Sequence, residues 1–469
     1  MIASDSRLVK PGDTFVAIRG ENDDGAKYIA AALAAGATEI VSETPSPTPL
    51  PSSVIYRLVP DTRAELARLA REAYGDPSRK LRVFGVTGTN GKTTVAHLIR
   101  AILNESGNPC ALVSTTGAAA SADPKTPLRP IANTTPGPLE LQALFAEALG
   151  AGCAACAMEV SSHAIAQKRV EGVKFAALAF TNLTQDHLDY HKTMEEYYAV
   201  KRSVFFDADV PAAINIDDRY GRRLFDELRA SSRTTPLLSY GASPDAQVRY
   251  ENELLAPDGS SFLLTFPDRG KEKMRLRLLG RHNIENALCA FSLALLAGVN
   301  PHKALISLML AKPVCGRLER VTLSDSPAAF FVDYAHTPDA LENVLRSLRE
   351  LTRRRLIVVF GAGGDRDRAK RPLMGEICSR LADISIVTSD NPRSENPAAI
   401  IEDIIAGCDE SSDILIIPDR RAAIRRAVLL ADSLGDVVIV AGKGHENYQI
   451  IGDRKTHFDD KEELENFGN

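Results

Sequence analysis

The 469-residue sequence predicts an α/β protein built from three domains. Short apolar strands alternate with amphipathic helices along most of the chain, which is the pattern of parallel sheets covered on both faces. The chain is also too long for one hydrophobic core. A new series of strands and helices starts near residue 317, after a helix that closes the preceding region.

The first predicted domain covers residues 1–61 and is a small α/β unit. TFVAIRG (14–20) and TEIVSE (38–43) have the composition of strands, and the helix AKYIAAALAAG between them ends at Gly36. A Pro-rich loop (44–53) precedes the short strand VIYRLV (54–59). We place the boundary just before the helix TRAELARLAREAYG (62–75), which leads into the second domain.

The second predicted domain covers residues 62–316 and has a mostly parallel sheet. Strands are expected at ALVST (111–115), ACAMEV (155–160), FAALAFTNL (175–183) and AAINI (212–216), with helices such as 139–152 between them. An antiparallel insert is expected at 248–257 and 259–266, where Asp258-Gly259 favours a hairpin turn. The helix 283–298 is expected to close the domain.

The third predicted domain covers residues 317–469 and is a Rossmann-like sheet. Its expected strands are the apolar runs 329–335, 355–364, 384–390, 414–418 and 437–444, with helices such as 338–351 between them. FGAGGDRD (360–367) has some of the glycines of a dinucleotide fingerprint but not the GxGxxG spacing followed by a helix. We therefore expect no NAD site there.

Composition excludes several classes of function. The net charge of −5 and a pI near 6.1 give no broad basic surface for nucleic acid or anionic membranes. No apolar run is long enough for a transmembrane helix, and the N-terminus lacks the features of a signal peptide. Seven scattered cysteines suit a reducing cytoplasm, and the lone pair Cys153 and Cys156 lacks the second pair of a zinc site.

The loop GTNGKTT (88–94) carries the clearest chemical signal. It follows the apolar strand VFGVT and precedes a helix with Val95, Leu98, Ile99 and Ile102 on one face. This layout directs backbone N–H groups and a helix N-terminus at an anion, with Lys92 as a cation and a threonine hydroxyl for Mg²⁺. The sequence therefore predicts a triphosphate cradle, although the usual GxxxxGK[ST] pattern would have glycine in place of Val86.

Other polar residues follow the predicted strands of the second domain. Glu159 ends one apolar run at the edge where open sheets place ligands, so that it is either a magnesium ligand or a buried, satisfied carboxylate. The next strand leads into TQDHLDYH (184–191), whose acids and histidines indicate metal or phosphate binding, with helix caps as the alternative. Lys201 lies on a predicted helix and, taken alone, has the pattern of a solvated charge.

The motifs taken together resemble the Mur ligase family. In chain order they are GTNGKTT, NTTPG, EVSSHAIAQKRV, TNLTQDHLDYH, YYAVKRSVF, GRHNIENALCA, GRLERV, DYAHTPDAL, FGAGGDRDRAKRPLMG, SDNPRSENP and AGKGHENYQ. The resemblance covers nearly the whole chain. It implies a cytoplasmic ATP- and Mg²⁺-dependent ligase that forms a carbon–nitrogen bond in peptidoglycan precursor synthesis, a process that supports cell shape and division.

The implied reaction joins meso-diaminopimelate to UDP-MurNAc-L-Ala-D-Glu through an acyl phosphate. The resemblance implies a monomer that binds neither nucleic acid nor membrane. Two alternatives remain open, namely a ligase of the same family that adds L-lysine and a nucleotide-binding relative that has lost catalysis. The form of the Asp390–Arg393 motif favours diaminopimelate, because Arg393 can pair with a distal carboxylate that lysine lacks.

The resemblance also implies roles for individual residues. The catalytic set is Lys92, Glu159, His187 and Lys201, in which Lys201 is a carbamylated lysine made from CO₂. The magnesium ligands are Thr93, Glu159, His187 and the Lys201 carbamate. The ATP-binding residues are Gly88, Thr89, Asn90, Gly91, Lys92, Thr93, Thr94, Asn283, Asn286, Arg317 and Asp333.

The two other substrates are assigned in the same way. UDP-MurNAc-dipeptide is expected to contact Ser6, Asn133, Thr134, Thr135, Ser161, Gln167 and Arg169. Diaminopimelate is expected to contact Arg366, Asp390, Asn391, Pro392, Arg393, Gly442 and Glu446. The chain departs from the family in starting close to the Asp5-Ser6-Arg7 motif, and in having Glu21, Asn22 and Asp23 on the uridine side.

Overall fold

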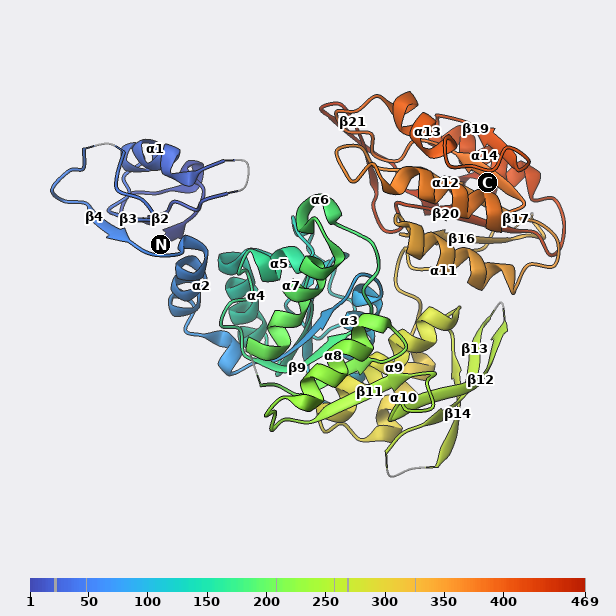
Figure 1. Ribbon diagram of the computed structural model, residues 1–469, viewed down its shortest axis with the longest axis horizontal. Helices are drawn as coiled ribbons and strands as arrows, with labels where there is room; N and C mark the ends of the chain where they lie inside the picture. Colours follow the sequence, from blue (N-terminus) through green and yellow to red (C-terminus); the bar gives the residue numbers. More distant parts are fainter. Residues whose placement is uncertain are drawn as a thin grey trace.

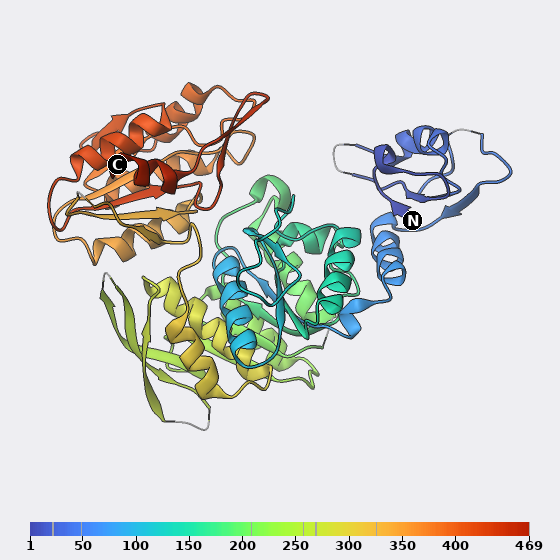
Figure 2. The same cartoon turned by 180° about the vertical axis from the view of Figure 1, so that it is seen from behind.

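The computed structural model describes residues 1–20, 23–47, 49–207, 209–256, 258–267, 270–324 and 326–468. Three large sheets follow one another along the described chain, each with its own buried apolar clusters, and a fourth, two-stranded sheet pairs β21 (Tyr448–Ile451) with β22 (Arg454–His457) in the third unit. The first and third units lie on opposite sides of the central one (Figures 1 and 2). No described helix is long and apolar enough to cross a membrane.

The first unit is a four-stranded parallel sheet in the order β1-β2-β3-β4. Its elements are β1 (Ile2–Ala3), η1 (Ser6–Leu8), β2 (Thr14–Val16), η2 (Gly25–Tyr28), α1 (Ile29–Ala34), β3 (Glu39–Ser42) and β4 (Ile55–Leu58). The single helix expected at 26–36 is thus split into a 3₁₀ turn and a short α-helix. The helix α2 (Thr62–Ala73) follows, with Leu66 packed against Val16 and Val41 of this sheet.

The central unit is a ten-stranded sheet in the order β14-β13-β12-β11-β10-β9-β5-β8-β6-β7. Its strands are β5 (Arg82–Thr87), β6 (Cys110–Ser114), β7 (Gly117–Ala119), β8 (Ala155–Glu159), β9 (Phe175–Phe180), β10 (Ala212–Asn215), β11 (Leu237–Gly241), β12 (Val248–Ala256), β13 (Gly259–Thr265) and β14 (Lys271–Leu276). The strands from β12 to β6 pair in parallel, which confirms the predicted sheet. The predicted antiparallel insert is also present as β12–β13–β14.

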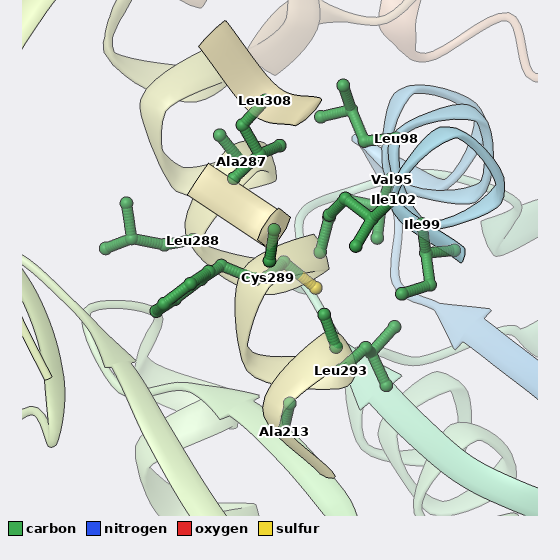
Figure 3. Packing of buried hydrophobic residues seen from close by; sticks show 14 of the residues in the cluster. Val95, Leu98, Ile99, Ile102, Ala213, Ala287, Leu288, Cys289, Leu293 and Leu308 are labelled. Carbon is green, nitrogen blue, oxygen red and sulfur yellow. The ribbon is translucent and has the colours of Figure 1, made fainter. Parts of the chain in front are cut away.

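Helices cover this sheet on both faces. They are η3 (Pro77–Arg79), α3 (Lys92–Glu105), α4 (Pro138–Gly150), α5 (Ser162–Ala166), α6 (Leu188–His191), α7 (Met194–Asp207), α8 (Arg219–Ala230), α9 (Arg281–Leu296) and α10 (Pro301–Leu310). The apolar face of α3 meets α9 and α10, as Figure 3 shows for Val95, Leu98 and Ile102 against Leu293 and Leu308.

The expectation that the helix at 283–298 closes the unit is wrong, because α10 follows it. Asn300 caps α10 by accepting hydrogen bonds from the N–H groups of His302 and Lys303, and Pro301 occupies its first turn. Leu305 and Leu308 then join the buried cluster of α3 and α9. The second helix therefore completes the apolar cover of α3.

The third unit is a six-stranded sheet in the order β15-β16-β20-β17-β18-β19, parallel except for β15. The elements are β15 (Glu319–Val321), β16 (Ala329–Asp333), α11 (Pro338–Arg349), β17 (Leu356–Phe360), α12 (Lys370–Leu381), β18 (Ile384–Val387), α13 (Pro397–Ile405), β19 (Asp413–Ile416), α14 (Arg420–Leu430), β20 (Val437–Ala441), β21 (Tyr448–Ile451), β22 (Arg454–His457), α15 (Asp460–Glu465) and η4 (Asn466–Gly468). The predicted Rossmann-like sheet is confirmed. The domain limits at 61/62 and 316/317 stay a prediction, which we use below as a convenient division.

Candidate active site

The loop between β5 and α3 has the backbone of an anion cradle. Gly88 and Gly91 have φ values of 149° and 86°, and a Cβ at Gly91 would overlap the side-chain oxygen of Asn286. Lys92 begins α3, and its ammonium donates to the carbonyl oxygens of Gly88 (3.0 Å) and Thr89 (2.7 Å). Burial lowers the pKa of Lys92. The loop thus holds its own cation at the helix N-terminus, where phosphate oxygens bind in such folds.

A cavity of about 470 Å³ lies over this loop, between the central and third units. Its wall contains many of the residues predicted for ATP and magnesium, which are Thr89, Asn90, Gly91, Lys92, Thr93, Thr94, Glu159, His187, Asn283, Asn286, Arg317 and Asp333. From the predicted UDP-substrate set it contains Thr134 and Ser161. The third unit supplies Arg317 and Asp333, so the cavity needs both units.

Glu159 lies at the end of β8 and is 1% exposed. One carboxylate oxygen accepts the backbone N–H of Thr115 (2.7 Å), and the other accepts the Thr115 hydroxyl (3.1 Å). The hydroxyl of Thr93 accepts a hydrogen bond from Arg317 Nη2 (3.0 Å). These oxygens face one cavity, and they suit a magnesium ion whose other ligands are phosphates and water. Among the described residues no group of three or more His, Cys, Asp and Glu converges as a preformed metal cage.

The loop after β9 brings His187 to the same cavity. Its backbone is left-handed, with φ of 54°, and its Nε2 lies 3.3 Å from a carboxylate oxygen of Asp186. Burial lowers the pKa of His187 to about 4, so that the ring is neutral at pH 7 and has a nitrogen lone pair for a metal. Its ring stands at 90° to that of His163, with 4.8 Å between the centroids.

Lys201 lies beneath the phosphate loop and is 1% exposed, so it is not a solvated helical charge. Its ammonium donates to the carbonyl oxygen of Gly88 (2.8 Å) and lies 4.8 Å from the centroid of the Tyr197 ring. Burial and then the charge of Lys92 lower the pKa of Lys201 far below that of an ordinary lysine. An amine in this setting has a larger neutral fraction than one in water.

Two asparagines and one aspartate complete the predicted nucleotide site. At the start of α9, Asn286 Nδ2 donates to Asn283 Oδ1 (3.1 Å), and Asn283 Nδ2 donates to the carbonyl of Leu279 (2.8 Å). Asp333 at the end of β16 accepts the backbone N–H groups of Leu318 (2.5 Å) and Ala335 (2.7 Å). Burial raises the pKa of Asp333.

Most residues predicted for the UDP substrate form one network beside Glu159. Thr135 donates its hydroxyl to the carbonyl of Glu159 (2.8 Å) and accepts the N–H of Ser161 (3.0 Å). Arg169 donates to the carbonyl of Thr135 (2.9 Å) and to Gln167 Oε1 (2.7 Å). The structure therefore brings these four together through hydrogen bonds between neighbours.

The remaining residues of that set are less connected. The hydroxyl oxygens of Thr134 and Thr115 lie 3.1 Å apart, within hydrogen-bond distance, which ties Thr134 to the Glu159 site. Asn133 is exposed, and Ser6 lies in η1 of the first unit, apart from the cavity wall. Glu21 and Asn22 lie outside the described residues.

The residues predicted for diaminopimelate gather in the third unit. Asn391 Nδ2 donates to Glu446 Oε2 (2.8 Å), and Arg393 Nη1 donates to the carbonyl of Gly364 (2.7 Å). The backbone of Gly442 lies close to Asp390, because a Cβ added there would be 2.6 Å from Asp390 Oδ2. Gly363 is similarly close to Arg393 and Arg366, at 2.9 and 3.8 Å from an added Cβ. Pro392 continues the same segment. This set is not in the wall of the cavity over the phosphate loop.

Sequence reasoning missed Asp339 at the start of α11. Its carboxylate accepts Asn90 Nδ2 of the phosphate loop (2.6 Å) and the hydroxyl of Thr184 (3.2 Å) from the loop after β9. Its position after Thr337-Pro338 has the pattern of an ordinary helix start. Only the packing of the third unit on the central one reveals this contact, so no local signal in the sequence could have identified it.

Comparison with known proteins places this geometry in a family. Profiles of the Mur ligase middle domain, of the Mur ligase glutamate ligase domain and of the Mur ligase family catalytic domain match residues 86–294, 316–444 and 1–74. The chain belongs to the Mur ligase family, as its motifs predicted.

Individual relatives are similar over nearly the full length. UDP-N-acetylmuramoyl-L-alanyl-D-glutamate--2,6-diaminopimelate ligase of Syntrophomonas wolfei is 44% identical over 98% of this chain and 92% of its own. The protein of the same name from Thermosynechococcus vestitus is 44% identical over 97% and 90%. A solved structure of a ligase of that name matches with a TM-score of 0.69 at 34% identity, covering 99% of this chain and 93% of that one.

A more distant structure shares the fold alone. The MurF ligase of Thermotoga maritima, solved in complex with ADP, has a TM-score of 0.64 at 19% identity and covers 94% of this chain and 93% of its own.

Proposed function

We propose that this protein uses ATP to join meso-diaminopimelate to UDP-MurNAc-L-Ala-D-Glu. The observation that carries the proposal is the cavity in which the phosphate loop, Glu159 and Arg317 meet, in a chain that is 44% identical over nearly its whole length to ligases named for this reaction. The product would enter peptidoglycan assembly, on which cell shape and division depend. The free cysteines fit a reaction in the reducing cytoplasm, and a single chain supplies the cavity, which supports action as a monomer.

In the first half-reaction the terminal carboxylate of the UDP substrate would attack the γ-phosphate of ATP. Lys92 and the N–H groups of the loop would hold the β- and γ-phosphates in line with that carboxylate. Arg317 would add a cation from the third unit, next to Thr93. Asn283 and Asn286 would contact the adenine, and Asp333 would bind the nucleotide from the other wall.

Magnesium, when bound, would neutralise phosphate charge as it develops. Thr93 and Glu159 would hold one ion, and His187 would help to hold a second. Lys201 would support that second ion as a carbamate, formed when its neutral amine adds to CO₂ and releases one proton. The burial of Lys201 and its lowered pKa favour the neutral amine that this addition needs.

In the second half-reaction the amine of diaminopimelate would attack the acyl phosphate and displace phosphate. Arg393 would pair with the distal carboxylate of the amino acid, and the Glu446 carboxylate would accept hydrogen bonds from its distal ammonium. L-Lysine has no distal carboxylate and would leave Arg393 without that partner. This favours diaminopimelate over the lysine-adding alternative.

The test is phosphate release by the purified protein with ATP, Mg²⁺, UDP-MurNAc-L-Ala-D-Glu and meso-diaminopimelate. Release should need all four components, and the product should have the mass of the tripeptide. Omission of the amino acid separates the ligase from a simple ATPase, which would release phosphate without it. ATP binding without release in the full mixture would instead support a relative that has lost catalysis.

A further inference from the structure

Lys370 is a buried cation that the reaction as described above does not use. It is the first residue of α12 and is 7% exposed. A positive charge at a helix N-terminus opposes the helix dipole, and burial adds a desolvation cost. Within the part of the chain that the structure describes, no hydrogen bond or ion pair within 4 Å holds its ammonium. The fold therefore maintains an unfavourable charge at this position.

Two other buried cations of the third unit show what a structural role looks like. Arg371 is 0% exposed and binds Glu395 and Asp403 through contacts of 2.8 Å. Lys443 is also 0% exposed and donates to the carbonyl of Tyr448. Each of these cations is held by protein oxygens at hydrogen-bond distance, although Arg371 Nε stays unpaired, whereas the Lys370 ammonium has no such partner among the described residues.

The charges that act on Lys370 come from both halves of the site. They are Asp186 from the loop after β9, Asp390 and Asp367, with Arg366 opposing them. Asp186 lies in the cavity wall with His336, and Asp390 begins the segment predicted to bind the amino acid. Lys370 is not itself in the cavity wall, but its charge acts both on Asp186 and His336 of that wall and on Asp390 of the predicted amino-acid segment. The acyl carbon would meet the amine between these two groups of residues.

We propose that Lys370 is a catalytic residue of amide formation, whose ammonium binds the oxygen that becomes negative as the amine attacks the acyl carbon. The inference rests on the proposed function and adds a group to its second half-reaction. There a carbon–nitrogen bond forms and the carbon–oxygen bond to phosphate breaks. The incoming ammonium group loses two protons, one to solvent and one to the departing phosphate, which leaves as HPO₄²⁻. Lys370 supplies charge and exchanges no proton.

The experiment separates the two half-reactions in Lys370→Met. Acyl-phosphate formation is measured without amino acid, as the UDP-substrate-dependent movement of ¹⁸O between bridging and non-bridging positions of the β-phosphate of labelled ATP. Amide formation is measured as turnover with meso-diaminopimelate. We expect turnover to fall about 100-fold, the usual effect of removing one group that binds a developing oxyanion, while the isotope exchange stays near the wild-type rate.

The retained exchange also shows that the variant is folded and binds ATP. The matched control is Lys303→Met, which removes an exposed lysine from the first turn of α10 and should change neither rate. Unchanged turnover in Lys370→Met, or an equal fall of turnover and exchange, would overturn the proposal. If the wild-type protein shows no ¹⁸O movement in ATP when the UDP substrate is present, that result contradicts the proposed function itself and is distinct from a failure of the Lys370 proposal.

Discussion

Lys201 is the residue whose chemistry differs most from its appearance in the sequence. Burial beneath Gly88 converts a helical lysine into an amine with a lowered pKa, next to the predicted metal site. If it acts as a carbamate, Lys201→Ala should nearly abolish turnover, and small carboxylates such as acetate should restore part of it by occupying the vacated space. Steady-state rates with and without acetate measure this, and wild-type activity in the variant would remove the carbamate role.

Arg393 should determine the choice of amino acid. Its left-handed backbone, with φ of 54°, and its bond to Gly364 hold the side chain beside Asn391. Loss of a charge-assisted pair should raise the KM for meso-diaminopimelate about 10- to 140-fold in Arg393→Ala, because such a pair contributes about 1.5–3 kcal/mol. The KM for ATP should change little, so that equal effects on both substrates would refute the assignment.

Glu285 gives the site a pH-dependent stability. Burial raises its pKa to about 7, so the folded chain binds its proton more tightly than the unfolded chain does. Binding of this proton adds to the free energy of unfolding. The contribution is fully present below pH 4.5 and is lost as the pH rises to about 7. Glutamine does not ionise, so Glu285→Gln should not lose this stability. The melting temperature of the variant minus that of the wild type should therefore be larger at pH 8 than at pH 5.

The size of this effect is on the order of 1.4 kcal/mol for each unit by which the folded pKa exceeds the unfolded one. Thermal unfolding without nucleotide at the two pH values measures it. Glu105→Gln, which changes an exposed carboxylate at the end of α3, should show no such difference between the two pH values. The same shift at pH 5 and pH 8 in Glu285→Gln would contradict the account.

At the scale of elements, the start of α11 is fixed to the phosphate loop. Asp339 joins Asn90 and Thr184 of the central unit, so its loss should loosen the third unit over the nucleotide. In Asp339→Ala the Kd for ADP should rise about 10-fold, as expected for the loss of two hydrogen bonds. Calorimetric titration measures this.

The control for Asp339→Ala lies on the same helix. Glu342 pairs with Arg346 and Arg380 and, among the described residues, makes no hydrogen bond or ion pair with the loop, so Glu342→Ala should leave the Kd for ADP unchanged. An unchanged Kd in Asp339→Ala would show that α11 does not hold the nucleotide site through this carboxylate.

The contrast between Lys92 and Asp339 shows how much could be predicted from sequence. Lys92 belongs to a strand, loop and helix that are contiguous, so local patterns were sufficient to place it. Asp339 and Asn90 are 249 positions apart, and their contact depends on how two units pack. Lys370 gave no signal for the same reason, since its burial arises from tertiary packing.

A helix and a hairpin are among the elements that the sequence analysis did not predict. Asn300 and Pro301 are standard helix-start residues, yet the preceding apolar helix was taken as the end of the unit. The hairpin β21–β22 turns at Gly452, which has a positive φ of 58°; β22 is exposed and most of β21 is half-buried. Its sequence lacks the apolar run by which the buried strands were recognised.

For the whole molecule, the fold alone does not define the substrate. The Thermotoga maritima MurF ligase shares the architecture at 19% identity. The nucleotide cavity draws on the central and third units, and the predicted amino-acid residues lie in the third alone. Choice of amino acid is therefore expected to depend on the third unit, while ATP use depends on how the two units meet.

The most direct test of the central claim is a competition between amino acids in one reaction. The protein is given ATP, Mg²⁺, UDP-MurNAc-L-Ala-D-Glu and equal concentrations of meso-diaminopimelate and L-lysine, and the UDP-linked products are weighed by mass spectrometry. The account predicts that the tripeptide product contains diaminopimelate and that no lysine product accumulates. A product that contains lysine in equal or greater amount would contradict the role given to Arg393 and the proposed substrate.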